Sequence, residues 1–276
     1  MSEQSFLERR KEELRVAPNP CQLDLGFNGA KGFFTTYDPS IEEKADRRQK
    51  VEKKNLPVQL IVLDMAKKAQ YFEKAKRNGN SINIGTSYFK DYDTDHITVW
   101  ENGGVAASGT YSEVKKFLND NNAKIVDVYF CWSPTLNAAV TFTATGGKKN
   151  IMRSAWKAEG GWSASPFIQL STGDEVGKDD DKASFTYFNI KMTLLGMDAV
   201  TEEMGAKCDE IGPAVLDYLD SAIAKSKEAA KAKAEAEKAE QDDPSELRKV
   251  GDPIMKAEPE EMEDVIEEDD EGGVDM

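Results

Sequence analysis

The sequence predicts a mixed α+β protein that is mainly β, with a long C-terminal helix and a disordered acidic tail. Three observations support this fold class. Short runs of β-branched and aromatic residues recur from Leu56 onward, separated by clusters of Gly, Asn and Asp. A segment made almost entirely of Ala, Lys and Glu follows them. The last seventeen residues hold ten carboxylates and no Lys or Arg, so they cannot build a core.

The first elements precede the β region. Ser5 and Glu8 match a capping box, which predicts a short charged helix that ends before Pro18. A loop rich in Gly and aromatic residues follows, and then a basic run with Lys44, Arg47, Arg48, Lys50, Lys53 and Lys54. We assign residues 1–55 to this N-terminal helix and basic, aromatic loop.

The β region begins at Leu56. The runs LPVQLIVLDM, SINIGTSYF and HITVW predict three strand regions, and TYSEVKKFLNDNN has the apolar spacing of a helix over residues 111–121. Two further strands are expected near residues 124–132 and 137–145. A five-stranded Greek-key barrel with a helix between its third and fourth strands, the OB-fold, has this order. The sequence therefore predicts an OB-fold-like barrel with extra strands over residues 56–200.

The remaining elements follow the expected barrel. TGGKKN at 145–150 has the composition of a hairpin turn, the acidic stretch at 173–182 that of a loop, and ASFTYFNIKMTLL that of a strand. A helix is expected from about Pro213 to Glu240, amphipathic only in its first half. We assign residues 201–241 to C-terminal helices and 242–276 to the acidic disordered tail.

The negative charge is concentrated in the tail. The chain has a net charge of −15, and residues 242–276 hold fifteen acidic and three basic residues, a net charge of −12. The preceding residues hold 33 basic and 36 acidic side chains, a net charge of −3. The low overall pI therefore does not exclude a basic surface for a polyanion on the folded part.

Few residues have the pattern of a catalytic or metal site. One histidine, His96, excludes a pair of His ligands. Asp91, Asp93 and Asp95 match the first ligands of a calcium-binding loop, but the required Gly and final Glu are missing, so an acidic turn is the better interpretation. Three scattered cysteines indicate a reduced protein, and neither a signal peptide nor a membrane span is visible. We expect a cytoplasmic protein that is not an enzyme and needs no cofactor.

Basic and aromatic residues occur together in several segments, as in proteins that bind single-stranded nucleic acid through phosphate contacts and base stacking. In an OB-fold, the segments after the first and fifth expected strands, KKAQYFEKAKR and GGKKNIMRSAWK, can border one groove. The alternative is that the rings are core residues beneath solvated lysines. The candidate nucleic-acid-binding residues are Lys31, Phe33, Phe34, Lys67, Lys68, Tyr71, Phe72, Lys74, Arg77, Tyr88, Phe89, Tyr92, Trp100, Lys148, Lys149, Arg153 and Trp156.

With an expected OB barrel, a basic and aromatic surface and an acidic tail, the chain resembles single-stranded DNA-binding proteins of the replication type, particularly those of bacteriophages. The resemblance lies in this organisation, without a shared motif. It implies weakly sequence-selective binding of single-stranded DNA during replication, recombination or repair. It also implies a tail that docks replication or repair proteins and competes with DNA for the groove.

Two interpretations of the tail stay open: a solubility segment, or a docking segment in which small apolar groups lie among carboxylates. The candidate docking residues are Val265, Ile266, Glu267, Glu268, Asp269, Asp270, Val274 and Met276. Two other function classes also remain. One is a phage or bacterial structural or scaffolding protein that assembles through its charged helix and tail. The other is a metal-dependent nuclease that uses Asp179, Asp180 and Asp181.

Overall fold

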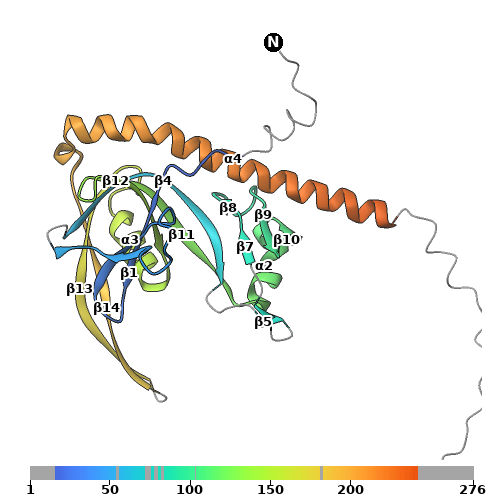
Figure 1. Cartoon of the computed structure of the whole chain (residues 1–276), viewed down its shortest axis with the longest axis horizontal. Coiled ribbons are helices and arrows are strands. Elements are labelled where there is room, and N and C mark those ends of the chain that lie inside the picture. The colour runs from blue at the N-terminus through green and yellow to red at the C-terminus, as the bar shows by residue number, and fades with distance from the viewer. Residues whose placement is uncertain are drawn as a thin grey trace, which may run out of the picture. The chain divides into compact units, whose positions relative to one another are not determined.

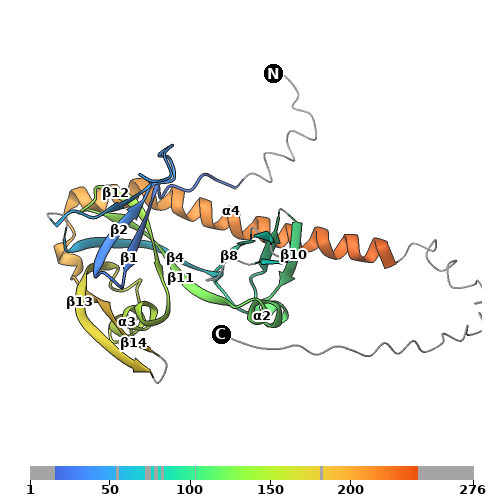
Figure 2. The same cartoon turned by 60° about the horizontal axis from the view of Figure 1, so that its bottom comes forward.

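A computed structural model describes residues 16–53, 56–71, 76–77, 80–81, 84–102, 104–180 and 183–241. It is a mixed α+β structure, mostly strands, with a long C-terminal helix (Figures 1 and 2). The expected N-terminal helix and the acidic tail lie outside the described residues. The helical elements are α2 (Tyr111–Asp120), α3 (Gly146–Lys157), the short 3-10 helix η2 (Met197–Ala199) and α4 (Glu202–Gln241). The strands are β1 (Leu23–Asn28), β2 (Phe33–Tyr37), β3 (Arg48–Lys50), β4 (Val58–Tyr71), β5 (Lys76–Arg77), β6 (Asn80–Ser81), β7 (Ile84–Thr86), β8 (Tyr88–Phe89), β9 (Ile97–Glu101), β10 (Gly104–Gly109), β11 (Ala123–Ser133), β12 (Ala138–Ala144), β13 (Phe167–Asp180) and β14 (Ala183–Leu194).

One large sheet organises the fold. Its strand order is β14-β13-β4-β11-β12-β1-β2-β3, and β8 pairs with β4 beside this path. The pairings are antiparallel except for β1 with β12, which run parallel. This parallel pair joins residues more than a hundred positions apart, and it attaches the N-terminal strands β1, β2 and β3 to β12, where they form one end of the sheet.

Both faces of the central strands are covered, which explains why β4 and β11 contain long apolar runs. On one face, Tyr129, Phe142 and Val62 pack with Met152 and Trp156 of α3. On the other, Val128 and Phe130 pack with Val215 and Leu219 of α4. Neighbouring side chains of a strand point to opposite faces of the sheet. Charged residues that are adjacent in a strand therefore lie on different faces.

The large sheet curls, and its two ends share one core. The backbone N–H of Phe188 in β14 donates to the carbonyl of Gly29 in the β1–β2 turn at 2.7 Å. Gly32 in the same turn has a φ of +64°, and a Cβ there would lie 2.8 Å from the Phe188 ring. This close approach therefore requires glycine. Among the described strands, however, β14 and β3 do not pair, so the expected closed barrel is not seen.

A smaller lobe is inserted between β4 and β11. The strands β10, β9 and β7 form a three-stranded sheet in this order. Ile97 and Val99 of β9 pack with Phe89 and with Val114 and Leu118 of α2 in a core of their own. In both views α4 runs along one side of the large sheet and of this lobe (Figures 1 and 2).

The expected helix over residues 111–121 and the two strands after it are confirmed as α2, β11 and β12. Three local predictions are wrong. Residues 146–150 begin α3 instead of forming a hairpin turn, because Met152 and Trp156 bury one helical stripe in the core. The stretch expected as an acidic loop continues β13 as far as Asp180. Finally, α4 begins at Glu202 and contains Pro213, because its first turns pack Met204 and Cys208 against a small apolar cluster.

The described residues up to Glu235 belong to one compact unit, and the last described residues of α4, from 236, belong to a second. No helix within the described part of the chain is both long enough and apolar enough to cross a membrane.

Candidate nucleic-acid interface

A groove of about 850 Å³ lies on one face of the large sheet, over β1, β2 and β3 and the neighbouring strands, and is called the β1–β3 groove below. Its described lining contains four cationic side chains and one carboxylate, so its local charge is positive although the chain as a whole is acidic. Aromatic rings and neutral polar groups make up much of the rest. The cations are Arg48, Lys50, Lys68 and Lys148, the carboxylate is Asp24, the rings are Phe33, Tyr37 and Tyr88, and the neutral polar groups include Asn28, Thr35, Gln70, Thr141, Thr143 and Thr145.

The strand register sorts these groups by chemistry. One row across four strands joins Thr141 of β12, Asp24 of β1, Tyr37 of β2 and Arg48 of β3. A parallel row joins Gly26, Thr35 and Lys50, and a third pairs Asn28 with Phe33. The exposed cations therefore lie on β3 at the edge of the sheet, the rings of Phe33 and Tyr37 lie on β2, and small or hydrogen-bonding groups lie on the same face of β1.

Each cation near a groove ring lies over the ring face. The Lys50 Nζ is 4.6 Å from the centroid of Phe33, the Arg48 Cζ is 6.0 Å from that of Tyr37, and the Lys68 Nζ is 5.7 Å from that of Tyr88. These are cation–π distances. The rings are half-buried, so they are held in place by the sheet and still expose part of their surface. A surface of rings and cations of this kind can bind a phosphate through the cations and a base through stacking.

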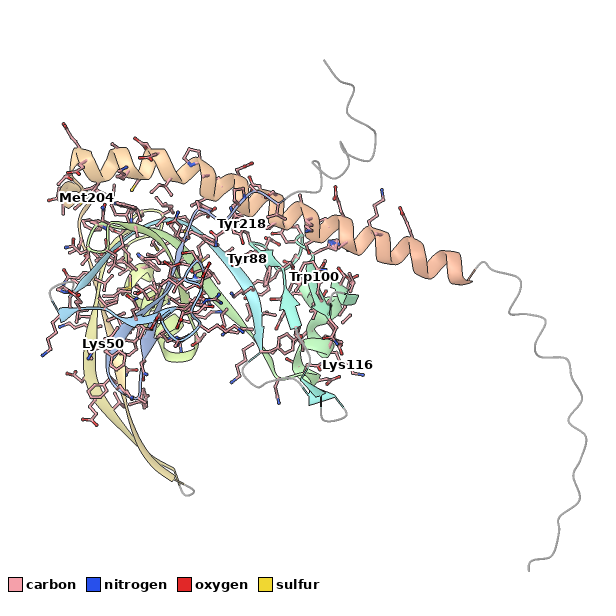
Figure 3. All side chains as sticks on the ribbon, in the orientation of Figure 1. Lys50, Tyr88, Trp100, Lys116, Met204 and Tyr218 are labelled. Atoms are coloured by element: carbon pink, nitrogen blue, oxygen red, sulfur yellow. The ribbon has the colours of Figure 1, made fainter. Side chains whose placement is uncertain are left out.

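Helix α4 holds the Tyr88 side chain in place through a ring contact. It lies on β8 beside Lys68 of β4, and its ring makes edge contacts with Phe130 and with Tyr218 of α4 at centroid distances of 5.7 and 6.0 Å. Burial, followed by Tyr218 and the hydroxyl hydrogen bond between the two, raises the Tyr88 pKa far above its usual range. Figure 3 shows Tyr88 and Tyr218 near one another below α4, and Lys50 among the N-terminal strands. Tyr88 therefore remains a neutral, rigid wall of the groove.

The inner cations are partly desolvated. Burial lowers the pKa of Lys68, and the nearby Asp24 carboxylate partly offsets this effect. Burial also lowers the pKa of Lys148, at the start of α3. An ammonium that has lost part of its water gains more from an anionic ligand than a fully hydrated one does. These two lysines are therefore suited to hold phosphate oxygens inside the groove.

Four of the residues chosen from the sequence come together in this groove: Phe33, Lys68, Tyr88 and Lys148. Sequence reasoning missed Arg48, Lys50 and Tyr37. A signal for them was present, since Phe33, Thr35 and Tyr37, and likewise Arg48 and Lys50, alternate along the chain with the period of a strand. Without this alternation, the basic run at 44–54 indicates only a charged segment.

Four other candidates gather on the opposite face. The Asp127 carboxylate is 0% exposed and is bound by Lys149 at 3.1 Å and by the Arg153 Nε at 3.0 Å. The Lys67 Nζ lies 5.1 Å from the centroid of Tyr92 and donates to the carbonyl of Lys90 at 2.5 Å. The assumption that Lys67 and Lys68 serve one groove is therefore wrong, because adjacent strand residues face opposite ways. This cluster neutralises a buried carboxylate.

Three candidate rings are core residues. Phe34 and Phe89 are 0% exposed, and Trp156 is 4% exposed with its indole N–H donating to the carbonyl of Ser165 at 2.8 Å. A ring with no free face cannot stack on a base, so the stacking role expected for these three residues is corrected to a packing role. The Phe34 ring contacts that of Phe27 at a centroid distance of 4.9 Å on the core side of the sheet.

The other candidates lie apart from the groove or outside the described residues. Lys31 is exposed in the β1–β2 turn, Tyr71 ends β4, and Trp100 is half-buried in β9 of the small lobe. Phe72, Lys74 and the side chain of Arg77 lie outside the described residues. So do all the tail candidates, Val265, Ile266, Glu267, Glu268, Asp269, Asp270, Val274 and Met276.

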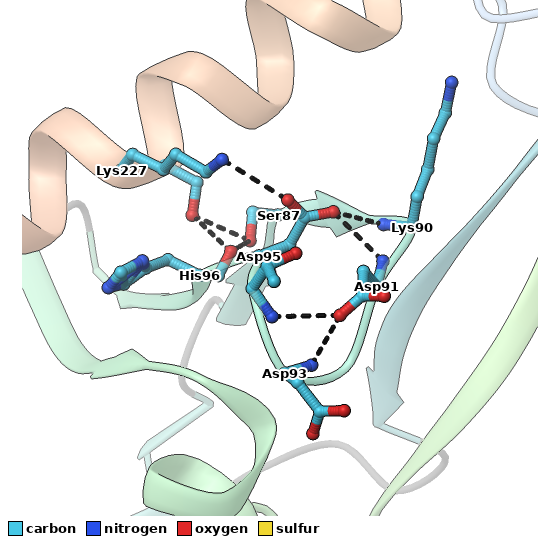
Figure 4. Close-up of polar contacts among 9 residues, drawn as sticks. Ser87, Lys90, Asp91, Asp93, Asp95, His96 and Lys227 are labelled. Carbon is cyan, nitrogen blue, oxygen red and sulfur yellow. Dashed lines mark hydrogen bonds and ion pairs between the residues drawn. The ribbon is translucent and has the colours of Figure 1, made fainter.

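The acidic turn at 91–95 is confirmed as a turn that binds its own backbone. Asp91 accepts the backbone N–H groups of Asp93 and Thr94, and Asp95 accepts those of Lys90 and Asp91 (Figure 4). Asp95 also pairs with Lys227 of α4 at 3.4 Å. The turn thus fastens α4 to the small lobe.

Beside this ion pair, a buried hydroxyl cluster completes the attachment. Ser226 of α4 shares hydrogen bonds with Thr98 at 2.8 Å and Ser87 at 3.1 Å, and donates to the carbonyl of His96 at 2.9 Å.

Within the described residues, no three His, Cys, Asp or Glu side chains gather as metal ligands do. Comparisons of the chain with protein-family models, curated proteins and solved structures found no match.

Proposed function

We propose that this protein binds single-stranded DNA in the β1–β3 groove, with little sequence preference and without catalysis, during replication, recombination or repair. The observation that carries the proposal is the joint lining of one groove by four cations and by the aromatic rings of Phe33, Tyr37 and Tyr88. Proteins that bind single strands combine these same two ingredients.

The rings favour a single strand over a duplex. Stacking on Phe33, Tyr37 or Tyr88 requires a free base face, and in a duplex the neighbouring base pairs cover both faces. The cations would neutralise phosphates, and this binding energy depends little on sequence. Stacking adds about 1 to 3 kcal/mol per base and also tolerates any base.

The OB-fold belongs to this proposal. The curled sheet, its shared core and the position of α2 between β10 and β11 support it, since the OB-fold is a partly open curled sheet that binds oligonucleotides on one face. A tail that docks replication or repair proteins and competes with DNA is also part of the proposal. Its support is the net charge of −12 on residues 242–276, opposite in sign to the groove.

Fluorescence anisotropy of labelled oligo(dT), titrated with protein at low salt, tests the proposal. Arg48→Glu with Lys50→Glu reverses two exposed groove charges that make no core contact, so the variant should fold normally. Its affinity should fall by roughly tenfold or more, because phosphate contacts supply most of the binding energy. Unlabelled duplex should compete poorly, and oligo(rU) as competitor compares RNA with DNA.

The matched control is Lys115→Glu with Lys116→Glu. Both lysines are exposed on α2 of the small lobe, and the total charge changes by the same amount. The proposal is wrong if wild-type protein does not bind oligo(dT) at low salt. It is also wrong if the two charge-reversed variants lose affinity equally, since binding would then reflect overall charge.

A further inference from the structure

One carboxylate lies among the cations of the groove. Asp24 is exposed on β1 and is the single acidic side chain in the described lining. It lies opposite Thr141 on the β12 side and Tyr37 on the β2 side, and the Thr141 hydroxyl donates to its Oδ1. A carboxylate has several acceptor sites, so this one bond fixes its orientation and leaves capacity for another donor.

Asp24 helps to keep Lys68 protonated, but a negative charge at this position also opposes the binding of phosphate. Its place in the register gives it a different role. Along one row, Arg48 lies at the edge of the sheet, Tyr37 lies next, and Asp24 lies beyond the ring. A nucleotide with its phosphate on β3 and its base against a β2 ring would direct the edge of that base toward β1.

The neighbouring residues on β1 fit the same arrangement. Gly26 and Asn28 follow Asp24 on this face, and Gly26 adds no side chain between them. A Cβ at Gly26 would lie 3.0 Å from the Thr35 Oγ1. The β1 surface next to the rings therefore has short side chains that can form hydrogen bonds. Contact with the edge of a base requires such a surface.

We propose that Asp24 contacts base edges and makes the groove prefer cytosine over thymine; this inference rests on the proposed function. An ionised carboxylate only accepts hydrogen bonds. Cytosine presents an N4 amino donor, whereas thymine presents the O4 acceptor at the corresponding position. A carboxylate binds the first and repels the second. Asp24 thus adds a modest base preference to binding that is otherwise unselective.

Parallel anisotropy titrations with oligo(dC) and oligo(dT) of equal length, at neutral pH, test the inference. Both are pyrimidines, so differences in stacking area are small. Wild-type protein should bind oligo(dC) about tenfold more tightly, the discrimination expected from one good contact with a base edge. Asp24→Asn keeps the size of the side chain and an acceptor for Thr141 but removes the charge. It should tighten binding to oligo(dT) relative to oligo(dC) and bring their affinity ratio close to one.

Asp120→Asn at the exposed end of α2 is the matched control, and it should leave the ratio unchanged. Equal wild-type affinities for the two oligomers would overturn the inference while leaving the proposed function intact. So would a ratio that Asp24→Asn does not change. Absence of binding to either oligomer would overturn both. The circular dichroism spectrum of Asp24→Asn shows whether the variant folds. If it folds poorly, the ratio of the wild-type affinities for oligo(dC) and oligo(dT) still tests the inference.

Discussion

Removing one groove cation should change the salt dependence of DNA binding by a calculable amount. The groove presents four cations, Arg48, Lys50, Lys68 and Lys148. If each neutralises one phosphate, the slope of log K against log salt is about −0.7 times four, or about −2.8. Between roughly 50 and 200 mM salt, the affinity then falls roughly 50-fold.

Lys50→Ala removes one contact and should reduce this slope to about −2.1, which is a loss of only roughly 20-fold over the same range. Oligo(dT) titrations at several salt concentrations measure the slope. Lys116→Ala, on α2 and distant from Lys50 (Figure 3), should keep the wild-type slope. An unchanged slope for Lys50→Ala, or equal slopes for the two variants, would refute the assignment of phosphates to this groove.

Four further predictions concern stacking, pH, stability and the tail. Phe33→Ala should lose about 1 to 3 kcal/mol of binding free energy by anisotropy without unfolding, whereas Phe34→Ala, in the core, should lose about 3 to 5 kcal/mol of folding free energy in urea; the reverse pattern would contradict the placement of the two rings. Because burial lowers the pKa of Lys68, the folded protein loses this proton at a lower pH than an unfolded chain does. As the pH rises through that lowered value, DNA affinity should fall while the stability of the free protein rises. Lys68→Arg, which keeps its charge, should show both trends more weakly, the remainder coming from Lys148, whose pKa burial also lowers; equal pH profiles would disprove this. Asp127→Asn should cost about 3 kcal/mol in urea unfolding, toward the low end for a broken buried ion pair because Arg153 is half exposed, and an unchanged midpoint would be inconsistent with the pairing. Deleting residues 242–276 removes a net charge of −12 and should tighten oligo(dT) binding at low salt, so unchanged affinity would argue against competition by the tail.

The fold class and several elements could be predicted because they depend on local patterns. The spacing of Val114, Phe117 and Leu118 identifies α2, and the β-branched runs identify β4, β11 and β12. Helix α3 was missed because the Gly-Gly pair at its start has turn chemistry. The Met152 and Trp156 stripe that fixes this helix acts only through tertiary packing.

The groove could be predicted only in part. Its chemical ingredients are visible in the sequence, and strand alternation alone separates Lys67 from Lys68. The parallel pairing of β1 with β12 is not local, however, and it is this pairing that brings Asp24 beside Thr141. Burial decides the rest: Phe33 and Phe34 are adjacent in sequence, yet only Phe33 lines the groove.

Photocrosslinking tests the central claim most directly. Oligonucleotides that carry 5-iodouracil, bound to the full-length protein and irradiated, join covalently to nearby aromatic residues, and mass spectrometry identifies the crosslinked peptides. The account predicts crosslinks to Phe33, Tyr37 or Tyr88, the rings of the β1–β3 groove. Crosslinks confined to Trp100 in the small lobe or to Tyr92 on the opposite face would contradict it.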